Sequence, residues 1–252
     1  MCTNKINPRN LYKRKLMYKR TKFVGLLIAL FSGVLFMAIV AKLGSIKKTS
    51  SVPKILLCGF EPFGPHSNNT SWEAISVYCA DVRTKYIESV KLPVSYRKAS
   101  VVLLEKIEET QPDIVVAFAM GRDSVVLQRV AINFDDAPWP DNDGERRQNE
   151  PIKRNGPVGF WSTLPLIEIQ DMLSRQQLSS EISNFCGNYL SNHIFYELMC
   201  LTEKNRKVKM AGLVHLPRYE YGFSKYDLAK VVGIVIDTCI SRLGKENSFP
   251  PQ

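Results

Sequence analysis

Histidine and carboxylate side chains are the first candidates for chemistry in this 252-residue chain. An imidazole titrates near neutral pH and can move a proton, so each of the three histidines is a candidate general base. His66 is expected in a solvated loop, whereas His215 lies in the apolar run VKMAGLVHL, which predicts a central strand. The neighbouring Asp135 and Asp136 resemble an acid–base pair, but adjacent side chains point apart, which favours capping or loop hydrogen bonds.

No residue pattern predicts a metal or a cofactor. One loop holds three acidic residues that could bind a cation only loosely, because nothing fixes a coordination geometry: Asp141, Asp143 and Glu145. The six cysteines show no CxxC or Cys/His spacing suited to zinc. We expect them to be small buried side chains, with disulfides open as an alternative if the domain faces an oxidising compartment.

Apolar runs and turn signals alternate along residues 53–246 and define the elements that must position these side chains. Buried strands are predicted at 54–60, 113–120 and 208–216, and helices at 70–81, 96–110, 164–175, 189–203 and 224–243. Thr70 and Glu73 form the capping-box pattern at the start of the first helix. Residues 136–160 are rich in Pro, Asp, Asn and Gly and predict a long loop or flap. Strands that alternate with helices indicate an α/β fold, a three-layer α/β/α sandwich with a largely parallel or mixed central sheet.

Several sequence blocks in the predicted domain carry a resemblance to a known family. They are GFEPFGPHSNNTSWEA (59–74), QPDIVV (111–116), GR…QRVAIN (121–133), WPDNDG (139–144), GPVGFWSTLP (156–165), CGNYLSNH (186–193) and AGLVHLP (211–217). In this order, and with little gapping, they resemble the pyroglutamyl peptidase I (pyrrolidone-carboxylate peptidase) family. Any single block would be weak evidence for this resemblance, whereas the whole series from Lys54 to Pro217 is specific to the family. The resemblance implies the family's fold and its activity, the removal of N-terminal pyroglutamate from peptides.

The resemblance also implies which residues occupy the family's Cys–His–Glu triad, in which a thiolate attacks, an imidazole moves the proton and a carboxylate orients the imidazole. It places Ser191 at the cysteine position, His215 at the histidine position and Gln128 at the glutamate position. A hydroxyl needs stronger general-base help than a thiol. An amide can hold one imidazole tautomer but carries no charge, and losing the carboxylate of a serine triad costs about 10⁴ in turnover. Very weak chemistry, or none, is therefore expected.

At other positions the chain lacks a hydrogen-bond donor of the family but retains residues of the family's pocket. The family's oxyanion-assisting arginine corresponds to Pro138, which donates no hydrogen bond. The family's Gln-Ala-Gly-Gly-Arg pocket segment is shortened here to residues 119–122. Phe60 and Phe63 match the aromatic residues that pack on the pyroglutamyl ring, and with Met120 they are the expected substrate-binding residues. A pocket for a small lactam is thus expected to persist.

Two residues near Ser191 have alternative interpretations. Cys186 lies five residues before Ser191 and is either a buried small residue, which we favour, or a relocated nucleophile. The second interpretation requires its sulfur to lie against His215. His193 is expected to be a structural histidine at a helix start rather than a second base, because His215 fills that role.

The positive charge of the chain belongs to its N-terminus. Residues 1–50 hold 11 Lys/Arg and no Asp/Glu, so the remaining 34 − 11 = 23 basic and 24 acidic residues give a formal charge of −1. The basic balance therefore does not predict nucleic-acid binding by the domain.

An uncharged run, FVGLLIALFSGVLFMAIVA, occupies residues 23–41. As a helix rising about 1.5 Å per residue it spans roughly 28 Å, close to the hydrocarbon thickness of a bilayer. The bias of basic residues toward its N-terminal side predicts that residues 1–22 stay cytoplasmic and that the domain lies across the membrane. A cleaved signal, which would give a secreted protein, and a buried core helix are the alternatives. The expected organisation is a basic tail (1–22), a transmembrane anchor (23–41), a linker (42–52), the α/β domain (53–246) and a frayed C-terminus (247–252).

Three functions fit these features. The first is a membrane-anchored pseudoenzyme that binds a peptide with an N-terminal pyroglutamate or similar small lactam, or a protein partner. The second is a weak serine-type hydrolase that uses Ser191, His215 and Gln128 on pyroglutamyl peptides or a related amide or ester. The third is a structural role in a membrane assembly. No cofactor, metal or nucleic acid is expected, and a homo-oligomer is compatible with the resemblance because members of the family associate.

Overall fold

The computed structural model describes residues 52–121, 123–204 and 207–246. Its strands are β1 (Ile55–Phe60), β2 (Ile87–Leu92), β3 (Ile114–Met120), β4 (Val125–Gln128), β5 (Val130–Ile132), β6 (Gly159–Trp161), β7 (Ser180–Ser183) and β8 (Met210–Leu216). Its helices are α2 (Thr70–Val82), α3 (Ala99–Thr110), α4 (Leu166–Arg175), α5 (Leu190–Lys204) and α6 (Lys225–Glu246), with a 3₁₀ turn, η1, at Tyr219–Tyr221.

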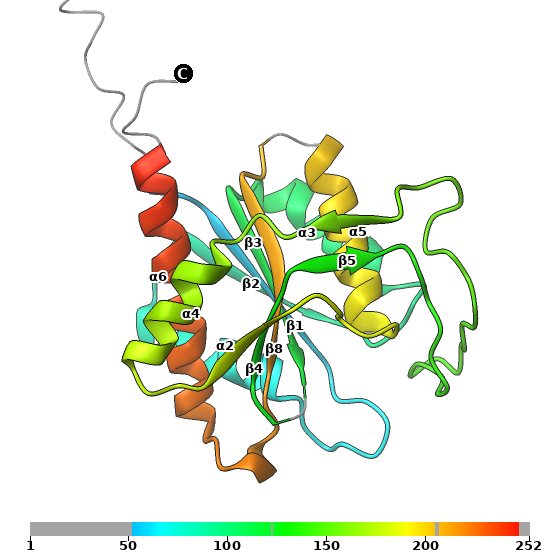
Figure 1. Ribbon diagram of the computed structural model, residues 1–252, viewed down its shortest axis with the longest axis horizontal. Helices are drawn as coiled ribbons and strands as arrows, with labels where there is room; N and C mark the ends of the chain where they lie inside the picture. The colour runs from blue at the N-terminus through cyan, green and yellow to red at the C-terminus, as the bar shows by residue number, and fades with distance from the viewer. Residues whose placement is uncertain (1–51, 122, 205–206, 247–252) are drawn as a thin grey trace, which may run out of the picture. The chain divides into compact units, whose positions relative to one another are not determined.

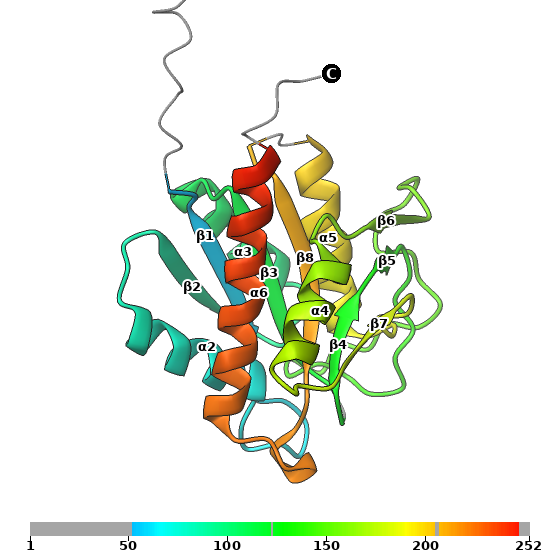
Figure 2. The same cartoon turned by 60° about the vertical axis from the view of Figure 1, so that its left-hand side comes forward.

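The strands form one main sheet between two layers of helices. Its order is β2-β1-β3-β8-β4-β7. Strands β2, β1, β3 and β8 run parallel, β4 runs antiparallel to β8, and β7 is parallel to β4. Helices α2, α4 and α6 cover one face and α3 and α5 the other (Figures 1 and 2). The predicted three-layer α/β/α sandwich with a mixed, largely parallel sheet is confirmed.

The central strands are apolar on both faces because helices cover both. Along β3, Val115, Ala117 and Ala119 pack in the cluster shared with α3 and α5, whereas the alternate residues pack toward α2 and α6. Because β1, β3 and β8 are parallel, their carboxyl ends meet at one edge of the sheet, near residues 60, 120 and 216. Such an edge is where ligand sites of α/β folds lie.

The predicted long elements agree with the structure within about three residues at each end. The predicted capping box is wrong in its cap: Asn69 caps α2, its Oδ1 accepting a hydrogen bond from the Ser71 N–H at 3.1 Å, and Thr70 is the first helical residue. The short strands β2, β4, β5, β6 and β7 were not predicted. They have three to six residues and mixed burial, so neither length nor alternation marks them.

The segment at 133–158, called the flap below, contains no helix or strand and one isolated bridge, between Asp135 and Glu150. It connects β5 to β6, so the predicted long loop is confirmed, although its last two predicted residues belong to β6.

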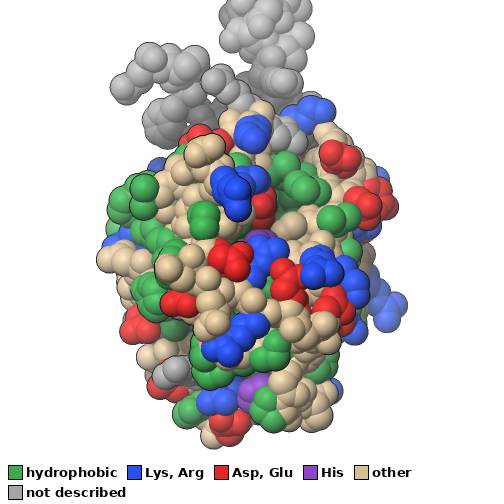
Figure 3. All heavy atoms as spheres, turned by 90° about the vertical axis from the view of Figure 1, so that its right-hand side faces the viewer, with side chains coloured by type: hydrophobic (Ala, Val, Ile, Leu, Met, Phe, Trp, Pro, Cys, Tyr) green, Lys and Arg blue, Asp and Glu red, His purple; other side chains and the backbone are tan. Residues whose placement is uncertain are grey.

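On the face shown in Figure 3, Lys/Arg and Asp/Glu side chains are interspersed.

The predicted basic tail, membrane anchor and linker up to residue 51, and the predicted frayed end at 247–252, lie outside the described residues. Across the described ranges, no helix has the length and apolar character needed to cross a membrane.

Candidate active site

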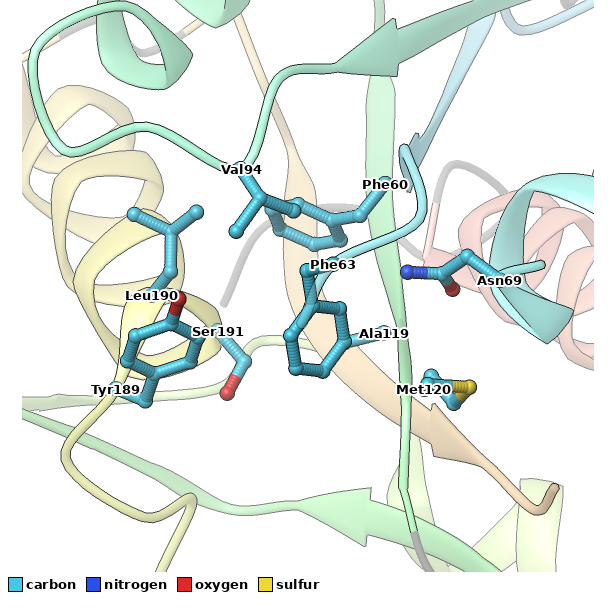
Figure 4. A pocket seen from close by; sticks show the side chains of 9 residues that line it. All are labelled: Phe60, Phe63, Asn69, Val94, Ala119, Met120, Tyr189, Leu190 and Ser191. Atoms are coloured by element: carbon cyan, nitrogen blue, oxygen red, sulfur yellow. The ribbon is translucent and has the colours of Figure 1, made fainter. Parts of the chain in front are cut away.

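A hollow opens at the carboxyl edge of the sheet (Figure 4). Its empty volume is about 320 Å³, part of which is open to solvent. Its lining comes from the end of β1 and the following loop, the cap of α2, the loop after β2, the end of β3 and the start of α5: Phe60, Phe63, Asn69, Val94, Ala119, Met120, Tyr189, Leu190 and Ser191. The three expected substrate-binding residues and Ser191 therefore share one hollow, which is mostly apolar.

Ser191 is the second residue of α5 and lies beside Tyr189 and Leu190, with Met120 on the other side of the hollow (Figure 4). The start of α5 is fixed by Asn192, a fully buried residue. The Asn192 Oδ1 accepts from the Ile132 N–H at 3.0 Å, and its Nδ2 donates to the carbonyls of Ile132 at 2.9 Å and Phe134 at 3.0 Å. Sequence reasoning missed this anchor, although an asparagine inside an apolar helix is a signal that could have found it.

His215 and Gln128 lie side by side on the two antiparallel strands β8 and β4. The pairing of Val126 with His215 and of Gln128 with Leu213 places both side chains on the sheet face that α5 covers. The Gln128 amide is 2 % exposed, and its Nε2 lies 2.9 Å from the His215 Nδ1. The structure thus brings together two of the three expected triad residues.

The direction of this contact decides what the imidazole can do. When the Gln128 Nε2 donates to the His215 Nδ1, the neutral imidazole carries its proton on its own Nε2. That nitrogen then cannot accept a proton from a hydroxyl. In this orientation the Gln128 Oε1 is buried without a hydrogen-bond partner. With the amide turned over, Oε1 accepts from an Nδ1–H, and the ring Nε2 is free to act as a base.

The electrostatic setting of His215 keeps the ring neutral. Burial lowers its pKa from 6.5 to about 4. No carboxylate of the described residues is bonded to this ring; its recorded side-chain partner is the uncharged Gln128. Although His215 is on the strand next to Ala119, which lines the hollow, it forms no hydrogen bond with Ser191 in the described structure.

Cys186 lies beside Ser191 but has the properties of a core residue. It is 6 % exposed and does not line the hollow. Burial raises its pKa to about 12, against the lowering effect of a hydrogen bond with the Ser191 side chain. The expectation of a buried small residue is confirmed here, and a thiol with this pKa is a poor source of thiolate.

His193 and Asp135 form a separate buried pair. The His193 Nδ1 lies 2.7 Å from an Asp135 carboxylate oxygen, and the Arg147 guanidinium lies 3.3 Å from the same oxygen. The ring of Tyr96 packs edge-on against His193. None of these residues lines the hollow, which agrees with a structural role for His193 and with hydrogen-bonding roles for the acidic residues.

The acidic loop residues are engaged in protein contacts. The Asp141 Oδ1 accepts from the backbone N–H groups of Asp143 and Glu145 at 3.0 and 2.8 Å. Asp143 pairs with Lys98 at 2.8 Å and Glu145 with Arg97 at 2.6 Å. In the described portion of the chain, no three His, Cys, Asp or Glu residues are grouped to hold a metal ion.

Pro138 and His66 are not among the residues that line the hollow. Pro138 is exposed on the flap and is not among the lining residues. Arg122 lies outside the described residues. His66 is half-buried rather than fully solvated, since its ring packs 5.5 Å from that of Phe63.

Comparisons with known proteins agree with this fold. The pyroglutamyl peptidase family model matches residues 53–231. Pyrrolidone-carboxylate peptidases of Bacillus mycoides and Brevibacillus brevis are 39 % and 40 % identical over 166 and 167 residues, which is 65 % of this chain and 77 % of each relative.

Solved structures give the same answer. Pyroglutamyl peptidase I of Bacillus amyloliquefaciens superposes with a TM-score of 0.71 at 28 % identity, over 75 % of this chain and 97 % of that one. A mutant pyrrolidone carboxyl peptidase of Pyrococcus furiosus superposes with a TM-score of 0.69 at 29 % identity, over 75 % and 99 % of the two chains. This chain therefore belongs to the pyroglutamyl peptidase family.

Proposed function

We propose that this chain is a membrane-tethered member of the family that binds the N-terminus of a peptide or protein in its hollow and hydrolyses it very weakly or not at all. One observation supports this most directly: the ring of His215 meets the uncharged amide of Gln128, and burial holds it neutral. A neutral ring without an anionic partner is a poor site for the imidazolium that forms when a nucleophile loses its proton.

The proposed binding function rests on the lining of the hollow. Phe60, Phe63 and Tyr189 give it aromatic walls, and Val94 and Leu190 add aliphatic ones. A five-membered lactam is small and flat, so it can lie against such rings and lose contact with water on both faces. An N-terminal pyroglutamate, or a similar small ring, is the ligand we propose.

The proposed loss of chemistry combines several deficits at the positions implied by the family motifs. Ser191 offers a hydroxyl where the family has a thiol, and it is not hydrogen-bonded to His215. Gln128 offers no charge, and Pro138 offers no donor for an oxyanion. Each deficit alone leaves some activity, whereas groups that act as a unit fail together.

The proposal is tested by measuring binding and turnover on the same full-length protein. We expect a pyroglutamyl dipeptide amide to bind, with a Phe63→Ala variant binding more weakly. We expect no release of aminomethylcoumarin from pyroglutamyl-aminomethylcoumarin above the level of a Ser191→Ala variant. Hydrolysis that disappears in Ser191→Ala would overturn the proposed loss of activity.

The second candidate is a weak serine-type hydrolase that uses Ser191, His215 and Gln128. A specific feature favours it: a His215 ring with a pKa of about 4 is in its basic form at neutral pH, and Ser191 borders the same hollow as the binding residues. A fluorophosphonate probe should then label the wild type and a Ser76→Ala control but not Ser191→Ala. Equal labelling of all three proteins would exclude this candidate.

Membrane anchoring is part of the proposal and rests on the apolar run at 23–41 and the basic residues before it. We propose a cytoplasmic N-terminus and a domain across the membrane, with secretion after signal cleavage as the alternative. Added protease should reach the domain only from the far side of the membrane. A mature N-terminus near Lys42 would instead support cleavage.

Self-association is also proposed. The end of the flap exposes Val158 at 89 % and strand β6 exposes Trp161 at 69 %, and a second copy of the chain could cover this apolar surface. Light scattering of the full chain in detergent, compared with a Trp161→Ser variant, tests this. A monomeric wild type would rule it out.

A further inference from the structure

Lys153, Glu197 and Cys200 form a polar cluster between the flap and helix α5. The Lys153 Nζ lies 2.5 Å from a Glu197 carboxylate oxygen and 3.6 Å from the Cys200 Sγ. Cys200 is 5 % exposed, while the Lys153 side chain keeps 39 % of its surface accessible. None of the three residues lines the hollow, so the proposed peptide-binding function leaves this cluster unexplained.

Both sides of the cluster are held in place by other contacts. The Lys153 N–H donates to the Asn133 Oδ1 at 2.8 Å, and its carbonyl accepts from the Asn133 Nδ2 at 2.9 Å. Nearby, the Tyr196 hydroxyl donates to the Pro157 carbonyl at 2.9 Å. Glu197 and Cys200 are three residues apart on α5, so they share one face of the helix. The amine is thus kept against the sulfur by a fixed framework.

A thiol in contact with an amine can react in a way that an isolated buried thiol cannot. Peroxides oxidise a cysteine to a sulfenic acid, and a sulfenic acid condenses with a nearby nitrogen to a sulfenamide. Holding the two groups together raises their effective concentration by orders of magnitude. We propose that Cys200 and Lys153 are an oxidative cross-linking site, at which a peroxide converts their contact into a covalent S–N bond between α5 and the flap.

The proposed reaction has two balanced steps. The Cys200 sulfur attacks hydrogen peroxide, so an S–O bond forms, the O–O bond breaks, one water leaves, and the sulfur is oxidised by two electrons while the peroxide is reduced. Lys153 passes its extra proton to Glu197, and its nitrogen then attacks the sulfur. The S–N bond forms, the S–O bond breaks, and the departing hydroxide takes an amine proton and leaves as the second water.

The surroundings of Lys153 predict how the reaction depends on pH. Burial lowers its pKa, but the hydrogen bond and charge of Glu197 outweigh this effect, so the net pKa is raised. The amine is therefore protonated at neutral pH, and the rate of cross-linking should increase with pH. A Glu197→Gln variant removes the charge that raises the pKa of the amine, so its rate of cross-linking should begin to increase at a lower pH than that of the wild type.

The cross-link would act on the helix that carries Ser191. The flap already contacts the residues just before Ser191: the Asp136 N–H donates to the Asn188 carbonyl at 3.0 Å, and the Tyr189 hydroxyl donates to the Pro140 carbonyl at 3.1 Å. A bond at Lys153 would add a covalent link to the hydrogen bonds that already hold the flap on α5. Neither chemical step requires peptidase activity, so the cross-link is expected equally in an inert protein.

Graded treatment of the full-length protein with hydrogen peroxide tests the proposal. After alkylation of the remaining thiols and chymotryptic digestion, mass spectrometry should find the peptides that contain Lys153 and Cys200 joined, with the combined mass reduced by two hydrogens. Dithiothreitol should separate them. The matched control Lys209→Arg, altered at a lysine that pairs with Asp113 at 2.9 Å, should cross-link like the wild type.

The variants define the outcomes. Lys153→Arg keeps a cation beside Glu197 and should lose the cross-link, as should Cys200→Ser, with unchanged circular dichroism as the check on folding. Oxidation of Cys200 to sulfinic acid without any joined peptide in the wild type would overturn the proposal. Joined peptides that retain the peroxide oxygen would overturn the S–N step, and a cross-link that persists in Lys153→Arg would overturn the assignment of the amine.

Discussion

Replacing Gln128 by Glu should raise the pKa of His215. At present the ring has a pKa of about 4, because burial disfavours its charged form and the amide 2.9 Å from Nδ1 supplies no charge. A carboxylate in hydrogen-bond contact shifts a neighbouring cation's pKa by about 1–3 units. The expected value in the variant is therefore about 5–7, which corresponds to roughly 1.4–4 kcal/mol in favour of the imidazolium.

The ring C–H signals of His215, followed by NMR in the full-length protein over a pH range that extends from below 4 to 8, measure this shift. A His215→Asn variant assigns the signals, and Gln128→Met is the matched control, since it keeps the volume and adds no charge. The Met variant should titrate near the wild-type value. If the Glu variant also titrates there, the side chain at position 128 does not contact the ring, and our explanation of the inactive base is wrong.

Three further predictions concern stability and binding. The depressed pKa of His215 means that the unfolded chain binds its proton first, so stability from this residue is full above pH 6.5 and falls by about 3 kcal/mol as the pH drops to 4. Urea unfolding should show this loss in the wild type and not in His215→Asn. Asn192→Ala should cost roughly 2–4 kcal/mol of unfolding free energy, because it leaves buried backbone groups unpaired, whereas Gln148→Ala, which removes an exposed amide, should cost almost nothing. Phe63→Ala should weaken binding of a pyroglutamyl dipeptide amide about tenfold, measured by calorimetry, and equal affinity would place the ligand outside the hollow.

The fold was largely predictable because its core elements are long and apolar. The buried strands that contain Cys58, Phe118 and Val214 are continuous apolar runs between helical stripes, which is how a parallel sheet covered on both faces is recognised. The short strand at 125–128 was missed because the burial of its side chains depends on the neighbouring strands β7 and β8. It also runs antiparallel to β8. Local sequence carries no signal for such a tertiary choice.

The residues of the site could be predicted from the sequence, but the contacts between them could not. Motif order led us to Gln128 and His215, and the structure places their side chains 2.9 Å apart. Motif order could not reveal that Ser191 lacks a hydrogen bond to His215, or that the neighbouring Cys186 is buried in the core. The cluster of Lys153 and Cys200 joins residues 47 positions apart through the path of the flap, and no spacing rule predicts it.

The central claim is that the hollow still binds its ligand and that the residues at positions 191 and 128 account for most of the loss of turnover. A Ser191→Cys/Gln128→Glu double variant of the full-length chain, assayed with pyroglutamyl-aminomethylcoumarin, tests it most directly. We predict turnover by the double variant, much less by either single variant, and none by the wild type. Ser191-dependent turnover by the wild type, or a folded double variant that binds the substrate and leaves it intact, would contradict the claim.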